Sequence, residues 1–92
     1  LLHGVASNAT RWSEFAARSA LRADWALLRM DLRGQGRSRW HGRTGMDQWC
    51  GDLAALLDAT GFGRALVGGH CLGANIALEF ARRRPERVQG LV

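Results

Sequence analysis

The sequence predicts an α/β protein, in which a parallel sheet is covered by crossover helices. Short, mostly apolar runs alternate along the chain with segments whose apolar residues recur at helical spacing. Glycine, proline and polar residues separate these segments, so the expected order is strand, helix, strand, helix, strand, helix, strand. Alternation of this kind is typical of right-handed βαβ units, which build a parallel sheet with helices on both faces.

The first half of the chain is expected to contain a strand, a helix and a second strand. These cover residues 1–2, about 11–21 and 25–30. Thr10 is placed to cap the helix, and Trp12 lies on its apolar face. The second strand ends at Asp31, and the glycines that follow it predict a loop.

The second half is expected to contain two helices, each followed by a strand. The first helix covers about residues 46–59, and the second runs from residue 72 to just before Pro85. The strands cover 65–68 and 87–92. Gly61 is the expected left-handed stop of the first helix. Cys50 lies on the apolar face of that helix, so we expect it to be buried as a small apolar residue.

The composition is that of a globular domain. The chain has 92 residues, 47% of them hydrophobic and 23% charged, and no apolar run approaches the roughly 20 residues that span a bilayer. The formal net charge is +5, which can indicate a nucleic-acid partner. The arginines, however, are scattered, and the one cluster, Arg82-Arg83-Arg84, falls at an expected helix end, where positive charge stabilises the helix dipole. We therefore expect no nucleic acid and no membrane span.

The two cysteines and the chain ends give further expectations. Cys50 and Cys71 show no metal-type spacing and nothing demands a disulfide, which is typical of a reducing compartment and indicates a cytoplasmic protein. The chain opens in a strand without an initiator Met and stops in another strand. Residues 1–92 are therefore expected to be one partial domain, cut at both ends.

The stretch LVGGHCLGANIALEFA, residues 66–81, places Cys71 between a strand and a helix. A sharp turn there lifts one side chain clear of the sheet, and its neighbours must be small because helix and strand nearly touch. Gly69 and Gly73 meet this requirement. A thiol at this tip is exposed at a helix N-terminus, which favours the reactive thiolate. The pentapeptide has the form of the nucleophile elbow G-x-S-x-G, with sulfur replacing oxygen. The alternative is an inert cysteine that fills a tight turn.

Acyl transfer also needs hydrogen-bond donors for an oxyanion, and the sequence offers two. One donor comes from the residue after the nucleophile, which is Leu72, and the other from a loop after an earlier strand. The loop His3-Gly4-Val5 follows the first strand at its carboxyl end. The two parts of an oxyanion hole are therefore both predicted.

Several stretches taken together resemble the α/β-hydrolase superfamily. They are Leu1-Leu2-His3-Gly4, Trp12, Asp31-Leu32-Arg33-Gly34-Gln35-Gly36-Arg37-Ser38, Gly69-His70-Cys71-Leu72-Gly73 and Arg84-Pro85-Glu86-Arg87-Val88. They match the superfamily in order and roughly in spacing. The resemblance implies a partial α/β-hydrolase fold, strands three to six of an eight-stranded sheet. It makes Cys71 the nucleophile, and Val5 and Leu72 the oxyanion donors.

The resemblance also implies supporting roles. His3, with Gly4 beside it, would hold the oxyanion loop in shape, and Asp31 would be structural rather than catalytic. Most members of the superfamily carry Ser where this chain has Cys71, and a minority uses Cys. The superfamily order places an acid and then a His after the nucleophile. Residues 72–92 contain no His, so this pair is expected beyond residue 92.

These residues predict an enzyme that cleaves or transfers the acyl group of an ester, lactone or thioester through Cys71. Its partner would be a small acyl substrate, and neither a cofactor nor a metal is implied. A thiolate forms a thioester intermediate, which suits acyl transfer as well as hydrolysis. The alternative is a catalytically inactive binding or signalling domain of the same fold, in which Cys71 is a relic.

Overall fold

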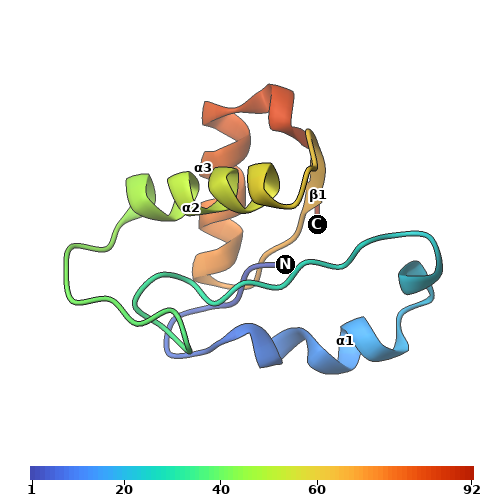
Figure 1. Cartoon of the computed structure of the whole chain (residues 1–92), viewed down its shortest axis with the longest axis horizontal. Helices are drawn as coiled ribbons and strands as arrows, with labels where there is room; N and C mark the ends of the chain where they lie inside the picture. The colour runs from blue at the N-terminus through green and yellow to red at the C-terminus, as the bar shows by residue number, and fades with distance from the viewer.

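The structure, a computed structural model, describes residues 1–92. Its helices and strands, with η marking a 3-10 helix, are η1 (Ala9–Trp12), α1 (Ser13–Arg18), η2 (Ala20–Ala23), α2 (Met46–Ala59), β1 (Ala65–Val67), α3 (Leu72–Arg83), η3 (Pro85–Arg87) and β2 (Val88–Leu91). In Figure 1, α2 and α3 lie above the extended N-terminal segments and α1 lies below them. The molecule thus has the helix–sheet–helix layering that alternating strands and helices predict.

All strand pairing is parallel. β1 pairs with β2, and Leu2 makes single parallel bridges to Met30 on one side and to Gly69 on the other. The order across the sheet is therefore the segment ending at Met30, the segment at Leu2, then β1 and β2. This order confirms the predicted α/β class and places the first expected strand between the second and the third.

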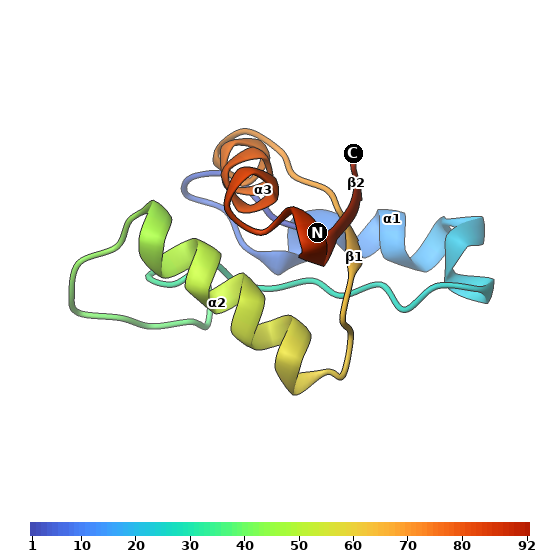
Figure 2. The ribbon, with the colours of Figure 1, turned by 90° about the horizontal axis from the view of Figure 1, so that it is seen from above.

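The core lies between the sheet and the pair α2 and α3. Its ten buried residues are Leu2, Leu32, Cys50, Leu53, Ala54, Leu57, Val67, Ile76, Ala77 and Phe80. Figure 2 shows α2 and α3 close together on the same side of the strands. An ion pair of 2.7 Å between Arg83 Nη1 and Asp47 Oδ1 also joins the two helices. The expected burial of Cys50 is confirmed, and burial raises the pKa of its thiol.

The second-half elements match their predicted bounds closely. α2 covers Met46–Ala59, and Gly61 follows it with a φ of 77°, the left-handed conformation that ends a helix. α3 begins directly after Cys71 and ends two residues before Pro85. No helix in the chain combines the length and the apolar character needed to cross a membrane.

The single helix predicted for residues 11–21 is wrong. The segment forms η1, α1 and η2, with Ser19 in an extended conformation between the last two. The Ser19 side chain accepts a 3.2 Å hydrogen bond from the Leu21 N–H, so it competes with helix continuation. Asn8, rather than Thr10, caps the start by accepting from the Thr10 N–H at 2.9 Å. None of the three pieces contains a fully buried residue, so little tertiary packing stabilises a longer helix.

The strands predicted for residues 1–2 and 25–30 are each reduced to one bridging residue. Leu2 and Met30 pair with one another, and the remainder of the 25–30 segment makes no ladder. Its outer edge has no neighbour, so most of its backbone groups lack a strand partner. The parallel direction of these segments is as predicted, but their regular pairing is not.

Candidate active site

Cys71 occupies a strained backbone position at the join of sheet and helix. It is the N-cap residue of α3 with φ 56° and ψ −119°. These angles lie outside the regions of the φ/ψ map that residues other than glycine ordinarily occupy. Its side chain is exposed, and it is a free thiol. The only other non-glycine residue with positive φ is Ala6, at 53°. The two strained residues therefore lie in the two loops that the sequence predicts to form the site.

The glycines around Cys71 allow three backbones to meet. A Cβ on Gly69 would overlap the carbonyl group of Gly73, and a Cβ on Gly73 would overlap the carbonyl group of Leu2. A Cβ on Gly4 would lie 3.0 Å from the Cβ of Cys71. Strand, helix and N-terminal loop are thus in direct contact at the elbow, which brings the loop that carries Val5 beside the thiol.

Backbone hydrogen bonds hold the elbow in this conformation. The His70 N–H donates to the Leu2 carbonyl at 3.1 Å, which ties the turn to the neighbouring strand. The Gly73 N–H donates to the His70 carbonyl and the Ala74 N–H to the Cys71 carbonyl, both at 3.0 Å. Strain at one residue persists where its surroundings fix it in this way.

The two N–H groups predicted to bind an oxyanion have no acceptor within the chain. Val5 N–H and Leu72 N–H appear in no backbone hydrogen bond outside the regular elements, and Leu72, as the first residue of α3, has no helical acceptor. Val5 directly follows Gly4 and Leu72 directly follows Cys71, and Gly4 and Cys71 are in contact. Unpaired N–H groups beside an exposed thiol could donate hydrogen bonds to an oxygen that gains negative charge.

His3 links the loop Gly4–Asn8 to the segment after the second strand. Its ring is fully buried, and its Nε2 accepts a hydrogen bond from the Leu32 N–H at 3.0 Å. Because Nε2 accepts, the proton of the neutral ring lies on Nδ1, which is 2.8 Å from the Gly4 carbonyl and donates to it. Both ring nitrogens are therefore engaged in hydrogen bonds within the chain, to the Gly4 carbonyl and the Leu32 N–H.

Asp31 accepts hydrogen bonds from two separate loops. The Ala9 N–H donates to Oδ1 at 2.6 Å and the Arg37 N–H to Oδ2 at 2.8 Å. These N–H groups, that of Arg37 first, hold the pKa of the carboxyl below its ordinary value. A Cβ on Gly36 would overlap the Asp31 carboxylate. The sequence offers only a weak signal for the bond to Ala9, namely an acid at a strand end followed by Gly-x-Gly.

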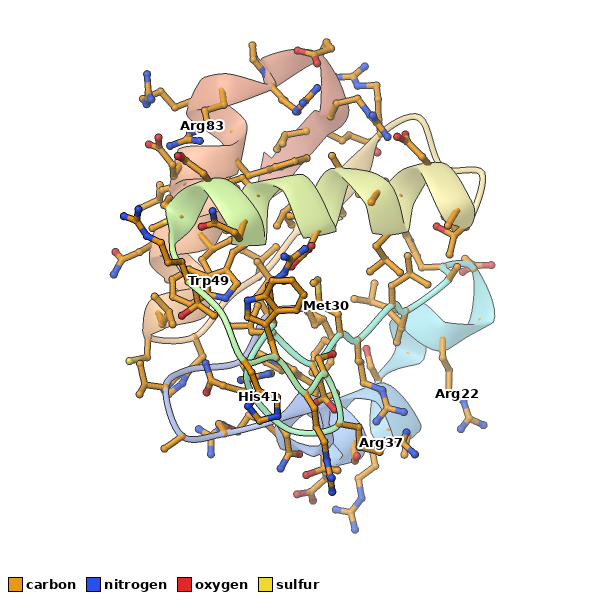
Figure 3. The ribbon with its side chains drawn as sticks, turned by 60° about the vertical axis from the view of Figure 1, so that its left-hand side comes forward. Arg22, Met30, Arg37, His41, Trp49 and Arg83 are labelled. Atoms are coloured by element: carbon orange, nitrogen blue, oxygen red, sulfur yellow. The ribbon has the colours of Figure 1, made fainter.

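A second polar cluster is built around Arg33, in the loop that follows Asp31. Arg33 donates from Nε to Asp52 Oδ2 of α2 at 2.9 Å, and its guanidinium lies 4.5 Å from the ring centroid of Trp40. Trp49 Nε1 donates to the Arg33 carbonyl at 3.3 Å. Figure 3 shows Trp49 between α2 and this loop. No sequence pattern pointed to this cluster, which fixes the loop to α2.

The remaining titratable candidates do not form an acid–base pair at the elbow. Glu79 is hydrogen-bonded to Arg82 and Arg83, which lower the pKa of its carboxyl to about 2. His41 is exposed on the loop that leads to α2 (Figure 3), and His70 is exposed beside Cys71. No carboxylate is hydrogen-bonded to a histidine ring in the described chain.

A strained residue on a strand-to-helix turn, set at the carboxyl edge of a parallel sheet and faced by a separate loop, defines the α/β-hydrolase class of folds. The family profile described as "alpha/beta hydrolase fold" matches residues 1–92. The chain belongs to this family.

Curated relatives and solved structures agree with the family assignment. Lipase LipV of Mycobacterium tuberculosis is 35% identical over 91 residues, which are 99% of this chain and 34% of the relative. The 2-hydroxy-6-oxononadienedioate/2-hydroxy-6-oxononatrienedioate hydrolase of Burkholderia vietnamiensis is 36% identical over 100% of this chain and 33% of its own. A thermophilic esterase from Thermogutta terrifontis superposes with a TM-score of 0.86 and 33% identity, covering 98% of this chain and 33% of that one. The chain thus spans about a third of the length of these relatives.

Proposed function

We propose that Cys71 is the nucleophile of an enzyme that hydrolyses or transfers the acyl group of an ester, lactone or thioester. The observation that carries the proposal is the conformation of Cys71 itself, an exposed thiol on a strained residue at the start of α3. Strain of this kind clusters at functional sites. The two unpaired N–H groups of Val5 and Leu72 beside it support the proposal.

The proposed reaction follows from these groups. The Cys71 thiolate attacks the carbonyl carbon, a C–S bond forms, and the carbonyl electron pair moves onto oxygen. The N–H groups of Val5 and Leu72 donate to that oxygen, which carries the developing negative charge. Collapse of the intermediate breaks the bond to the leaving group, which takes a proton as it departs. Water or another acceptor then attacks the thioester, releases the acyl group and restores the thiol.

The general base and its carboxylate partner are proposed to come from outside residues 1–92. Both ring nitrogens of His3 are already hydrogen-bonded, to the Gly4 carbonyl and the Leu32 N–H. No carboxylate is hydrogen-bonded to the ring of His41 or His70. The relatives are about three times as long as this chain, which leaves room for these groups. The names lipase and esterase borne by relatives support an ester as the substrate class.

The test is turnover by the full-length protein that carries these residues, with p-nitrophenyl esters as probes. We expect Cys71→Ala to lower kcat by several orders of magnitude, as deletion of other nucleophiles does. Cys71→Ser is expected to retain a small fraction, because a hydroxyl depends more strongly on the general base. Cys50→Ala is the matched control and should stay near wild type. Full activity in Cys71→Ala would refute the proposal, and a wild-type protein without turnover on esters, lactones or thioesters would favour the inactive binding domain.

A further inference from the structure

We propose that Asp31 is a positioning residue that holds the oxyanion loop, Gly4–Asn8, so that the Val5 N–H faces the carbonyl attacked by Cys71. The inference rests on the proposed function, and it assigns to Asp31 a role that the proposed function does not include. The hydrogen bonds of the Asp31 carboxylate come from the Ala9 and Arg37 N–H groups, and neither Cys71 nor a proposed oxyanion donor is among its partners. It acts through the backbone of the loop.

The oxyanion loop is tied at both ends by adjacent residues of another segment. At the start of the loop, the Leu32 N–H donates to the ring of His3, which in turn donates to the Gly4 carbonyl. At the end of the loop, the Ala9 N–H donates to Asp31 Oδ1 at 2.6 Å. A carboxylate acceptor makes this bond stronger than one between neutral groups.

Between these two points the loop has little support of its own. Val5 is exposed, and Ala6 holds a positive φ of 53°. The one hydrogen bond from this stretch to the segment that carries Asp31 is a long one of 3.5 Å, from the Ser7 N–H to Gln35 Oε1. The loop contains neither helix nor strand, so its conformation depends on how its two ends are held.

The position of the loop matters for the reaction more than for folding. An oxyanion donor works only when it already points at the oxygen of the transition state. A misplacement of about 1 Å can reduce a rate by about a hundredfold. Loss of the Asp31–Ala9 bond should therefore impair acylation while the elbow, whose contacts do not include Asp31, keeps its form.

Ala9→Pro in the full-length protein tests the tether. It removes only the N–H that donates to Asp31 and keeps the carboxylate with its second bond to Arg37. Proline is well accommodated at the first position of a helical turn, and Asn8 before it is already extended, with φ −157° and ψ 179°, as a residue before proline requires. Asp31→Asn is the second variant. Asp58→Asn is the control, because it breaks the ion pair of Arg87 between α2 and η3 without touching the oxyanion loop or the segment that carries Asp31.

Two reactions of Cys71 separate positioning from general damage. Acylation by p-nitrophenyl acetate needs the oxyanion donors, whereas alkylation by iodoacetamide needs only an exposed thiolate. We expect Ala9→Pro and Asp31→Asn to slow acylation about ten- to a hundredfold and to leave the alkylation rate within about twofold of wild type. KM should change less than kcat, and Asp58→Asn should leave both reactions unchanged.

The remaining outcomes overturn the inference. If both reactions slow together, Asp31 is merely structural, and if Ala9→Pro acylates at the wild-type rate, the tether does not position the donor. Failure of the proposed function looks different, because the wild-type protein itself would then show no acylation at Cys71.

Discussion

The glycines of the elbow are the residues whose size the structure restricts most tightly. A Cβ on Gly69 would overlap the backbone of Gly73, so Gly69→Ala must push β1 and α3 apart. We expect the free energy of unfolding of the full-length protein to fall by about 1–3 kcal/mol, as in other overpacked sites. Urea denaturation measures the change.

Gly51 provides the matched control for this substitution. It lies exposed in the middle of α2, and a Cβ there would meet nothing within 4 Å. Gly51→Ala should stabilise the protein by up to about 1 kcal/mol, because alanine has the higher helix propensity. Equal effects of the two substitutions would show that the elbow is not closely packed.

Asp31 gives the site a predictable response to acid. The N–H groups of Arg37 and Ala9 hold the pKa of its carboxyl below the ordinary value, which is about 3.9. Because the folded pKa is the lower one, the ionised carboxylate contributes stability that is present above about pH 5 and is lost as the pH falls through the folded pKa. The difference in unfolding free energy between wild type and Asp31→Asn should therefore shrink below about pH 4. A difference that is constant from pH 7 to pH 3 would contradict this account of the carboxylate.

At the scale of the elements, α3 joins the elbow to the core. Phe80 is fully buried on its inner face, whereas Leu78 on the same helix is 60% exposed. Phe80→Ala is expected to destabilise the full-length protein by about 3–5 kcal/mol, and Leu78→Ala by no more than about 0.5 kcal/mol. Thermal or urea unfolding of the two variants side by side checks the assignment of the faces. Similar losses from both would mean that the outer face of α3 is also covered in the full-length protein.

The elements that sequence reasoning placed correctly are those whose apolar face is buried. α2 has the predicted bounds because apolar periodicity, burial and the stop at Gly61 agree. The segment from residue 11 to 21 has similar periodicity, but none of its helical pieces buries a residue. Local capping by Asn8 and Ser19 therefore decides its conformation. Periodicity predicts a face, and only packing against another element makes that face stable.

The candidate site likewise combines features set by local sequence with contacts between residues far apart in the chain. The elbow around Cys71 could be predicted because its requirements are local, namely small residues two positions away on either side. The Asp31–Ala9 bond joins residues 22 positions apart, and no periodic or spacing rule specifies such a contact. The bidentate pair of Arg33 and Asp52 was missed for the same reason.

At the scale of the whole molecule, one face of the sheet is poorly covered. Leu66 and Leu91 of the paired strands are 42% and 44% exposed, while α1 on that side buries nothing. The accessible surface is 5928 Å² for 10.1 kDa, whereas a typical folded monomer of this mass exposes about 5,300 Å². Residues 1–92 thus pack a core between the sheet and the helices α2 and α3, and they leave apolar side chains of the other sheet face exposed.

This uncovered face predicts how residues 1–92 behave when expressed alone. The bare segment should be marginally stable, bind the apolar dye ANS and aggregate, because sheet edges and apolar side chains are exposed. Calorimetry and light scattering of the purified segment provide the measurement. A sharp, cooperative thermal transition of the monomeric segment would contradict the expectation.

The most direct test of the central claim is to identify the acylated residue. The full-length protein is mixed with p-nitrophenyl acetate, quenched in acid within the first turnovers, digested and sequenced by mass spectrometry. The account predicts an acetyl thioester on Cys71, sensitive to hydroxylamine, with Cys50 unmodified and the adduct absent from Cys71→Ala. Steady turnover of the ester with acetyl found on another residue, or with no adduct at Cys71 under conditions that accumulate the intermediate, would contradict the account.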